Sequence, residues 1–243
     1  MILLVDIHNH ILPGLDDGAA TEEQSLMLIE SAAANGIKHI IATPHQNETY
    51  KNKSSVVYGR VNEMNALLLE KGIPVTLYAG MEILLNEGIL DNSLLTLANS
   101  GKYVLIELPN NHFPPYLFDV LYKLQLKGLV PIIAHPEKNP VLMKKRDKVL
   151  EIVARGALLQ ITAGSVLGKN GRKVKAFSKQ LLKEQLVHFI ASDAHSRQRP
   201  FLLTKAYEYI ESSYGTHLVD YFKENAKHVI RGSEFYALDP KRH

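Results

Sequence analysis

The chain has 243 residues, a formal net charge of +3 and no cysteine. The lack of cysteine excludes disulfide bonds, thiol nucleophiles and zinc–thiolate sites. So small a net charge gives no reason to expect a nucleic-acid partner. No run of about 18 apolar residues predicts a transmembrane helix, and the N-terminus lacks the basic region and cleavage site of a signal peptide. We therefore expect a cytoplasmic protein with no direct membrane insertion, folded as one domain over residues 1–243.

Short apolar runs rich in Ile, Val and Leu alternate with longer amphipathic segments along the chain. Runs of this kind are typical of strands that are buried on both faces of a parallel sheet. The predicted strands are residues 2–7, 37–43, 75–81, 102–108, 129–134, 157–162 and 187–192. The predicted helices are residues 22–35, 57–71, 115–127, 146–155, 174–185, 200–214 and 217–226, with one or two more within 86–100. Helix C-caps are expected at Gly36, Gly72, Gly128 and Gly156.

This strict alternation predicts an α/β fold with parallel strands and right-handed crossovers. Either a closed barrel or an open sheet satisfies the pattern. The first predicted strand is not followed by a glycine-rich loop of the dinucleotide or P-loop type. Its end instead reads HNHILPGLDDGA, which is rich in metal-ligand residue types.

Six of the seven predicted strands are followed by His, Asp or Glu. The carboxyl ends of parallel strands lie on one face of the fold, so we expect these side chains to converge there. A reading in which they are only buried, hydrogen-bonded polar groups remains open. The candidate ligands are His8, His10, Asp17, His45, Glu82, Glu107, His135, Asp193 and His195.

Imidazole and carboxylate ligands without sulfur suit Zn²⁺, Mn²⁺ or Fe²⁺ better than Ca²⁺ or Mg²⁺. The nine candidates are five neutral imidazoles and four carboxylates, with a summed charge of −4. They are too few for three closed tetrahedral sites but enough for two or three ions that share a carboxylate. Three divalent ions would leave a net charge of +2, which attracts a phosphate dianion. Such ions lower the pKa of bound water to about 7, so a metal-bound hydroxide is the expected nucleophile.

Six segments carry a resemblance to a known family: DIHNHILPGLDDGA, ATPH, the strand end at Glu82, VLIELP, PIIAHPEKNP and FIASDAH. The chain resembles members of the polymerase-and-histidinol-phosphatase (PHP) superfamily, and more narrowly the manganese-dependent protein-tyrosine phosphatases of bacterial capsule and exopolysaccharide operons. The resemblance implies a distorted seven-stranded (β/α) barrel of PHP type with three metal ions. The implied ligands are His8, His10, Glu82 and Asp193 for the first ion, Glu82, Glu107 and His135 for the second, and Asp17, His45 and His195 for the third.

Two acidic residues near these ligands receive other roles. Asp17 rather than Asp16 is taken as the ligand because it directly precedes Gly18, as in the family motif. Asp16 then supports a ligand or leads into the following helix. Asp6 is expected to orient a ligand rather than to bind metal.

The family also binds phosphate through arginines, and two positions of this chain correspond to them. The first is Lys138 in HPEKNP, where Arg is common. A lysine cannot form a forked contact with two phosphate oxygens, so weaker phosphate binding is expected at this position. The second region, SDAHSRQRP, offers Arg197 and Arg199, of which Arg199 is the preferred phosphate ligand. Arg199 and Lys138 are the expected catalytic side chains, with Arg197 as a further substrate-binding candidate.

The resemblance implies hydrolysis of phosphotyrosine in protein, with the tyrosine-rich tail of a bacterial tyrosine kinase as the substrate. Mn²⁺ is the expected ion, and Fe²⁺ or Zn²⁺ suit the same ligands. A first alternative is a histidinol-phosphate-type small-molecule phosphatase or a phosphodiesterase that uses the same metals. A second alternative is a regulatory or scaffold protein that keeps the metals without turnover. The loop after the fourth predicted strand also offers His112, Phe113 and Tyr116 as lining for the cleft.

Overall fold

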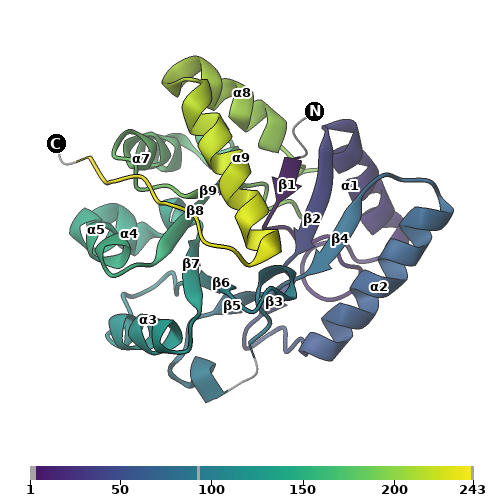
Figure 1. Ribbon diagram of the computed structural model, residues 1–243, viewed down its shortest axis with the longest axis horizontal. Coiled ribbons are helices and arrows are strands. Elements are labelled where there is room, and N and C mark those ends of the chain that lie inside the picture. The colour runs from purple at the N-terminus through teal and green to yellow at the C-terminus, as the bar shows by residue number, and fades with distance from the viewer. Residues whose placement is uncertain (1–3, 92–93, 242–243) are drawn as a thin grey trace.

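The computed structural model describes residues 4–91 and 94–241 of the chain. Its strands are all paired in parallel and form two hydrogen-bonded sheets, around which the helices are arranged (Figure 1). The first sheet has the order β1 (Leu4–Asp6), β2 (Ile37–Ala42), β4 (Thr76–Ala79). The second has the order β3 (His45–Gln46), β5 (Glu82–Leu84), β6 (Tyr103–Glu107), β7 (Val130–Ala134), β8 (Leu158–Thr162), β9 (Phe189–Ala191). The predicted α/β class with parallel strands is therefore confirmed.

The seven main predicted helices are all present, within a few residues of the expected bounds. The helices are α1 (Glu22–Ala34), α2 (Ser54–Glu70), α3 (Leu117–Leu126), α4 (Pro140–Lys144), α5 (Arg146–Ala154), α6 (Ala163–Leu167), α7 (Arg172–Lys183), α8 (Leu203–Tyr214) and α9 (Thr216–Arg231). The region 86–100 contains two short 3₁₀ helices, Glu87–Asp91 and Leu97–Asn99, instead of longer helices. Residues 2 and 3 of the first predicted strand and residues 92–93 lie outside the described residues.

The four predicted C-cap glycines all have left-handed backbone angles. Their φ values are +80° at Gly36, +64° at Gly72, +77° at Gly128 and +84° at Gly156. A side chain with a Cβ is strained in this region, so glycine ends each helix at low cost. These caps turn the chain from a helix directly into the next strand.

Two of the predicted strands are each followed, after a break, by a further short strand that lies outside the predicted bounds. The second continues past Thr43-Pro44 into β3, and the third breaks at Gly80-Met81 before it resumes as β5. Proline cannot donate to a strand ladder, which explains the first break. At Gly80, an added Cβ would lie 2.8 Å from Cγ2 of Ile41, so the chain passes too close for a side chain there. His45 and Glu82 therefore begin strands of the second sheet instead of following strands of the first.

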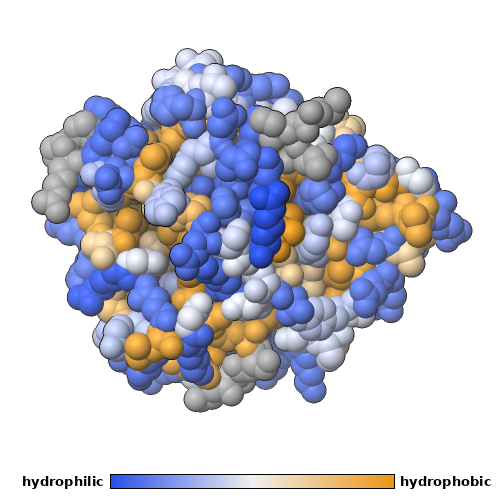
Figure 2. Space-filling view, viewed as in Figure 1, coloured by the Kyte–Doolittle hydropathy of each residue, from blue (hydrophilic) through white to orange (hydrophobic). Residues whose placement is uncertain are grey.

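Apolar side chains form two clusters. The larger lies mainly between the strands and the surrounding helices. The smaller brings together strand residues such as Val5, Leu105, Ile132 and Phe189 with Val229 of α9. A helix that contacts both β1 and β9 thus covers this interior cluster (Figure 1). The surface over α9 is mainly hydrophilic in Figure 2.

The two sheets approach each other at β1, the first strand of one, and β9, the last strand of the other. Asn9 and Ala194, which follow β1 and β9, form a parallel bridge. Asp6 reinforces this junction because its carboxylate accepts hydrogen bonds from the backbone N and the hydroxyl of Ser192, at 2.8 and 2.6 Å. In the described part of the chain, no helix is both long and apolar enough to cross a membrane.

Candidate metal centre

The candidate ligands converge at the carboxyl ends of the strands, as the parallel topology requires. The segment His8–Asn9–His10 leaves β1 in extended form, so both imidazoles point to the same side. The backbone of Asp193 donates to the carbonyl of His8 at 2.8 Å, which fixes the end of β9 against this segment. His135 and Asp193 have positive φ angles of +32° and +52°. Non-glycine residues in this region are strained, and such strain is concentrated at functional sites.

Glu82 is the centre of the cluster and is fully buried. Its Oε2 lies 3.3 Å from Nε2 of His8, 3.4 Å from Nε2 of His10 and 2.9 Å from Nδ1 of His45. Its other oxygen, Oε1, lies 2.8 Å from Nε2 of His135. One carboxylate thus contacts four imidazoles that come from three separate segments of the chain.

The remaining candidates lie on either side of Glu82. Oδ1 of Asp17 is 3.5 Å from Nε2 of both His45 and His195. On the other side, Nε2 of His135 is 3.9 Å from Oε1 of Glu107. Oδ1 of Asp193 is 3.7 Å from His8 and 3.6 Å from His10. All nine predicted ligands therefore lie in one continuous cluster.

Three groups within this cluster have ligand atoms close enough together to hold one metal ion each. They are His10, Asp17, His45 and His195; His8, His10 and Glu82; and His45, Glu82 and Glu107. These groups differ in part from the sets that the family resemblance implies. His10 also lies with the Asp17 group, His45 lies with Glu82 and Glu107, and neither Asp193 nor His135 belongs to any of the three groups.

The donor atoms fit a cation better than they fit one another. Oε2 of Glu82 is buried and accepts no hydrogen bond, although three imidazole nitrogens surround it. Nε2 of His8 and Nε2 of His10 face each other at 3.2 Å. Buried polar atoms normally have partners, so an unpaired carboxylate oxygen among converging nitrogens is the arrangement expected around a metal ion.

The electrostatics of the cluster also favour a bound cation. Burial opposes ionisation of Glu82, yet attraction from His8 and the close approach of the other imidazoles hold its pKa well below the usual range. Asp193 is likewise buried, but His8 and Lys138 keep its pKa below the usual range. Burial and the charge of Glu82 raise the pKa of Glu107. The centre thus holds ionised carboxylates that require positive charge beside them.

Two side chains orient the first pair of imidazoles. Oδ2 of Asp16 lies 2.7 Å from Nδ1 of His10, and Oε1 of Gln160 lies 2.7 Å from Nδ1 of His8. Each contact leaves Nε2 of the imidazole directed at the cluster, which is the usual support of a metal-binding histidine. Gln160 belongs to the one predicted strand that is not followed by His, Asp or Glu, and the sequence pattern alone does not assign it this supporting role. Asp6 accepts hydrogen bonds from Asn9 and Ser192, which are neighbours of the candidate ligands in the sequence and not ligands themselves.

The predicted phosphate-binding cations behave differently from one another. The ammonium of Lys138 donates to Oδ2 of Asp193, and Nη2 of Arg199 donates to the same oxygen at 3.1 Å. Both line the cleft of about 210 Å³ that seven of the nine candidate ligands also line, all but His8 and His10. Asn110, to which the sequence pattern assigns no role, lines it too. Arg197 does not line this cleft, and its guanidinium contacts Sδ of Met27.

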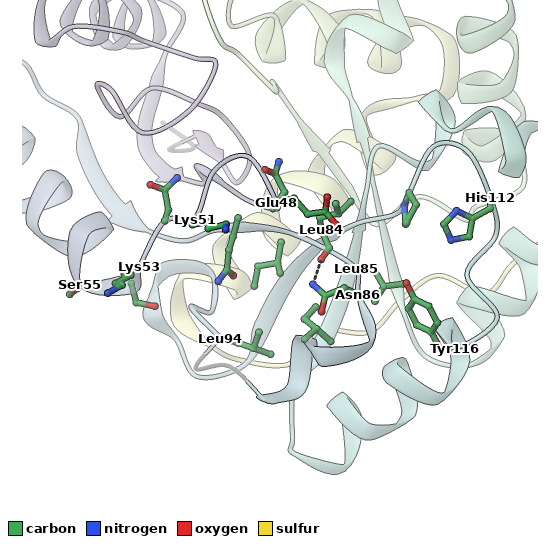
Figure 3. Close-up of a pocket in the computed structure, with 17 residues that line it drawn as sticks. Glu48, Lys51, Lys53, Ser55, Leu84, Leu85, Asn86, Leu94, His112 and Tyr116 are labelled. Atoms are coloured by element: carbon green, nitrogen blue, oxygen red, sulfur yellow. Dashed lines mark hydrogen bonds between the residues drawn. The ribbon is translucent and has the colours of Figure 1, made fainter.

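A larger groove, of about 990 Å³, lies next to the metal cleft. Its lining includes Gln46 and Ile83, which directly follow the candidate ligands His45 and Glu82 in the sequence, and Pro109. Figure 3 shows Lys51 and Lys53 on one side of it and His112 and Tyr116 on the other. Leu84 and Leu85 lie between them. Phe113 does not line the groove; its ring packs near that of Phe118 instead.

Comparisons with known proteins agree with this geometry. Residues 4–231 match the family model described as capsular polysaccharide synthesis, CpsB/CapC. The tyrosine-protein phosphatase YwqE of Bacillus subtilis is 38% identical over 244 residues, which covers 98% of this chain and 96% of that protein. The tyrosine-protein phosphatase CpsB of Streptococcus agalactiae is 28% identical over 239 residues, covering 94% and 98%.

Solved structures show the same relationship. A solved structure from work on YwqE of Bacillus subtilis and CpsB of Streptococcus pneumoniae, which are described as metal-dependent tyrosine phosphatases, superposes on this chain with a TM-score of 0.94. The two chains are 37% identical, and the match covers 99% of this chain and 100% of the other. The histidinol phosphate phosphatase of Lactococcus lactis superposes with a TM-score of 0.52 at 14% identity, covering 96% and 94%. This second similarity concerns the fold alone.

Proposed function

Because this chain belongs to the CpsB/CapC family of capsular polysaccharide synthesis, we propose that it is a metal-dependent protein-tyrosine phosphatase, a phosphoric monoester hydrolase. Relatives that match nearly the full length of the chain are named tyrosine-protein phosphatases, and a solved structure with a TM-score of 0.94 is described as one of the metal-dependent kind. The nine candidate ligands and the two cations beside them supply the groups that such an enzyme needs.

The charge of the cleft is the observation that carries this proposal. The carboxylates that line it outnumber the cationic side chains, so the protein alone repels a phosphate dianion. Two divalent ions would reverse the sign and make the same cleft attract one. The lining carboxylates are Asp17, Glu82, Glu107 and Asp193, and the lining cations are Lys138 and Arg199.

We propose that the ligands divide among two or three ions, with Glu82 shared between at least two. The residues that would hold them are His8, His10, Asp17, His45, Glu82, Glu107, His135, Asp193 and His195. Mn²⁺ is the proposed ion, since nitrogen and oxygen ligands suit it, and Fe²⁺ or Zn²⁺ fit the same set. When bound, divalent ions neutralise phosphate oxygens and supply a hydroxide nucleophile at neutral pH.

The protein's own residues bind and orient the substrate. Lys138 and Arg199 bring two positive charges to one edge of the cleft, where each now contacts Asp193. Their exposed fractions of 25% and 50% leave them free to turn toward phosphate oxygens. Arg199 can contact two oxygens at once, whereas Lys138 acts as a point charge. The leaving phenolate, with a pKa near about 10, departs more readily than an alkoxide.

The physiological substrate that we propose is the tyrosine-rich tail of a bacterial tyrosine kinase, in the cytoplasm. The groove in Figure 3 supports a polypeptide substrate because it is several times larger than the cleft and continues from it along β3 and β5. Its apolar floor and polar rim are the features with which peptide-binding clefts receive an extended chain.

The test compares phosphate release from a phosphotyrosine peptide, histidinol phosphate and a phosphodiester. The protein is stripped with a chelator and reloaded with Mn²⁺ before each assay. We expect release from the phosphotyrosine peptide to exceed release from the other two at least tenfold, and to vanish without metal. Preference for histidinol phosphate or the diester would contradict the proposal. Bound metal without phosphate release from any of the three would instead indicate a scaffold protein.

A further inference from the structure

A second pocket, of about 610 Å³, adjoins the metal cleft on the side opposite to β3 and β5. It shares Lys138, Asp193 and Arg199 with the cleft and is otherwise lined by residues of the segments after β8 and β9 and of α8. Its distinctive property is its charge. Five cationic side chains line it against a single carboxylate: Lys138, Lys169, Arg197, Arg199 and Lys205 against Asp193.

The cations farther from the metal cleft have no anionic partner. Asp193 is already paired with Lys138 and Arg199. Within residues 4–91 and 94–241, neither Lys169 nor Lys205 forms an ion pair, and Arg197 contacts only the sulfur of Met27 among side chains. Like charges gathered in a concave surface raise the local potential and attract anions.

Two further features of the pocket provide partners for an anion. The twelve-residue helix α8 begins at its wall, with Leu202 as the N-cap and no side chain capping the first turn. Uncapped N–H groups at a helix N-terminus are favourable for a negative charge. Thr162 also lines the pocket; it is only 4% exposed, and its hydroxyl has no hydrogen-bond partner.

We propose that this pocket is a second anion subsite, which takes an acidic side chain of the substrate polypeptide while the phosphotyrosine occupies the metal cleft. The proposal rests on the phosphatase function proposed above. The pocket adjoins the cleft, so a residue close in sequence to the phosphotyrosine can reach it. Lys169 and Lys205 then bind the carboxylate, and the enzyme selects phosphotyrosines that have an acidic neighbour.

The experiment measures kcat/KM for pairs of phosphotyrosine peptides that carry Glu or Gln at one position, scanned on both sides of the phosphotyrosine. With Mn²⁺-loaded protein at low salt, we expect a preference of about fivefold for Glu at one or more positions, the size expected for two exposed charge pairs. The preference should fall toward unity at about 0.5 M NaCl because salt screens exposed charges.

Variants identify the pocket as the source of that preference. In the double variant Lys169→Ala, Lys205→Ala, the Glu/Gln ratio should fall to about one, whereas Lys169→Arg, Lys205→Arg should keep it. Lys71→Ala is the matched control, since Lys71 is exposed at the end of α2 and lines neither pocket. Gly164→Leu keeps every charge but fills the pocket, because a Cβ at Gly164 would lie 3.7 Å from Cβ of Lys169. It too should abolish the ratio.

Each contrary outcome has a distinct meaning. Equal kcat/KM for every Glu and Gln pair, with the Gln peptides still hydrolysed, would overturn the subsite while leaving the phosphatase function intact. If inorganic phosphate inhibited the natural chain more strongly than the double alanine variant and no pair differed, the pocket would bind free phosphate, and the proposed occupant would be wrong. Failure to hydrolyse any phosphotyrosine peptide or a simple aryl phosphate would instead refute the proposed function.

Discussion

The substitution Asp16→Asn tests whether a buried carboxylate outside the ligand set controls metal affinity. Oδ2 of Asp16 contacts Nδ1 of His10 at 2.7 Å and accepts from the backbone N of His45 at 3.0 Å, while Oδ1 accepts from the backbone N of Gly18 at 3.0 Å. The amide oxygen of the variant can keep the contacts with His10 and His45 only if the NH₂ group faces the backbone N–H of Gly18, with which it cannot form a hydrogen bond. The change therefore removes one hydrogen bond and the negative charge behind His10.

The expected cost follows from these contacts. Loss of a carboxylate that supports a metal-binding histidine lowers metal affinity by roughly tenfold to a hundredfold. A tenfold loss corresponds to about 1.4 kcal/mol of binding free energy. We expect the lower end of that range, because the oxygen that remains still supports His10. In Asp16→Ala, where His10 loses its acceptor entirely, the loss should be larger.

Calorimetric titration of the metal-free protein with Mn²⁺ measures the dissociation constants directly. Asp147→Asn is the control, since it makes the same charge change at an exposed position of α5. Circular dichroism is the check that the variants remain folded. Equal Mn²⁺ affinities of the natural chain and both Asp16 variants would refute the orienting role of Asp16.

Three other substitutions probe different parts of the account. Arg199→Ala should lower kcat/KM for a phosphotyrosine peptide about a hundredfold, with metal content unchanged by elemental analysis; unchanged turnover would remove Arg199 from the site. Gly18→Ala should deplete bound metal and lower Tm, because its Cβ would lie 1.9 Å from the carbonyl oxygen of His10; normal metal content would contradict this. Burial lowers the pKa of His188 to about 4. As the pH falls from about 6.5 to 4, the unfolded chain therefore binds a proton at this residue while the folded chain does not. The free energy of unfolding should then be lower by about 2 kcal/mol at about pH 5 than at neutral pH. The variant His188→Asn can still accept the hydrogen bond from the backbone N of Leu159. Urea unfolding at neutral pH and at about pH 5 should show no such decrease in its free energy of unfolding, and an identical decrease would exclude His188 as the source.

The sequence was informative where one local rule determines the structure. Glycines at helix ends and alternating apolar runs predicted the helices, the parallel strands and the face on which ligands meet. The convergence of His8, Glu82 and His135 follows from topology alone, because the carboxyl ends of parallel strands share one face. The division of the ligands among ions remains a prediction.

Other features depend on contacts between distant segments. The break before β5 arises where Gly80 passes close to Ile41, which no local pattern reveals. The contact of Arg197 with Met27 turns that guanidinium away from the cleft, although its position beside Arg199 in the sequence suggested otherwise. The basic pocket likewise exists only after folding, since Lys169 and Lys205 come from separate segments of the chain.

Diffraction from crystals grown with Mn²⁺, recorded at the manganese absorption edge, tests the central claim most directly. The account predicts two or three anomalous peaks about 3.5–4 Å apart, with Glu82 contacting at least two of them. Peaks only at the surface, or a single peak that Glu82 does not contact, would contradict it.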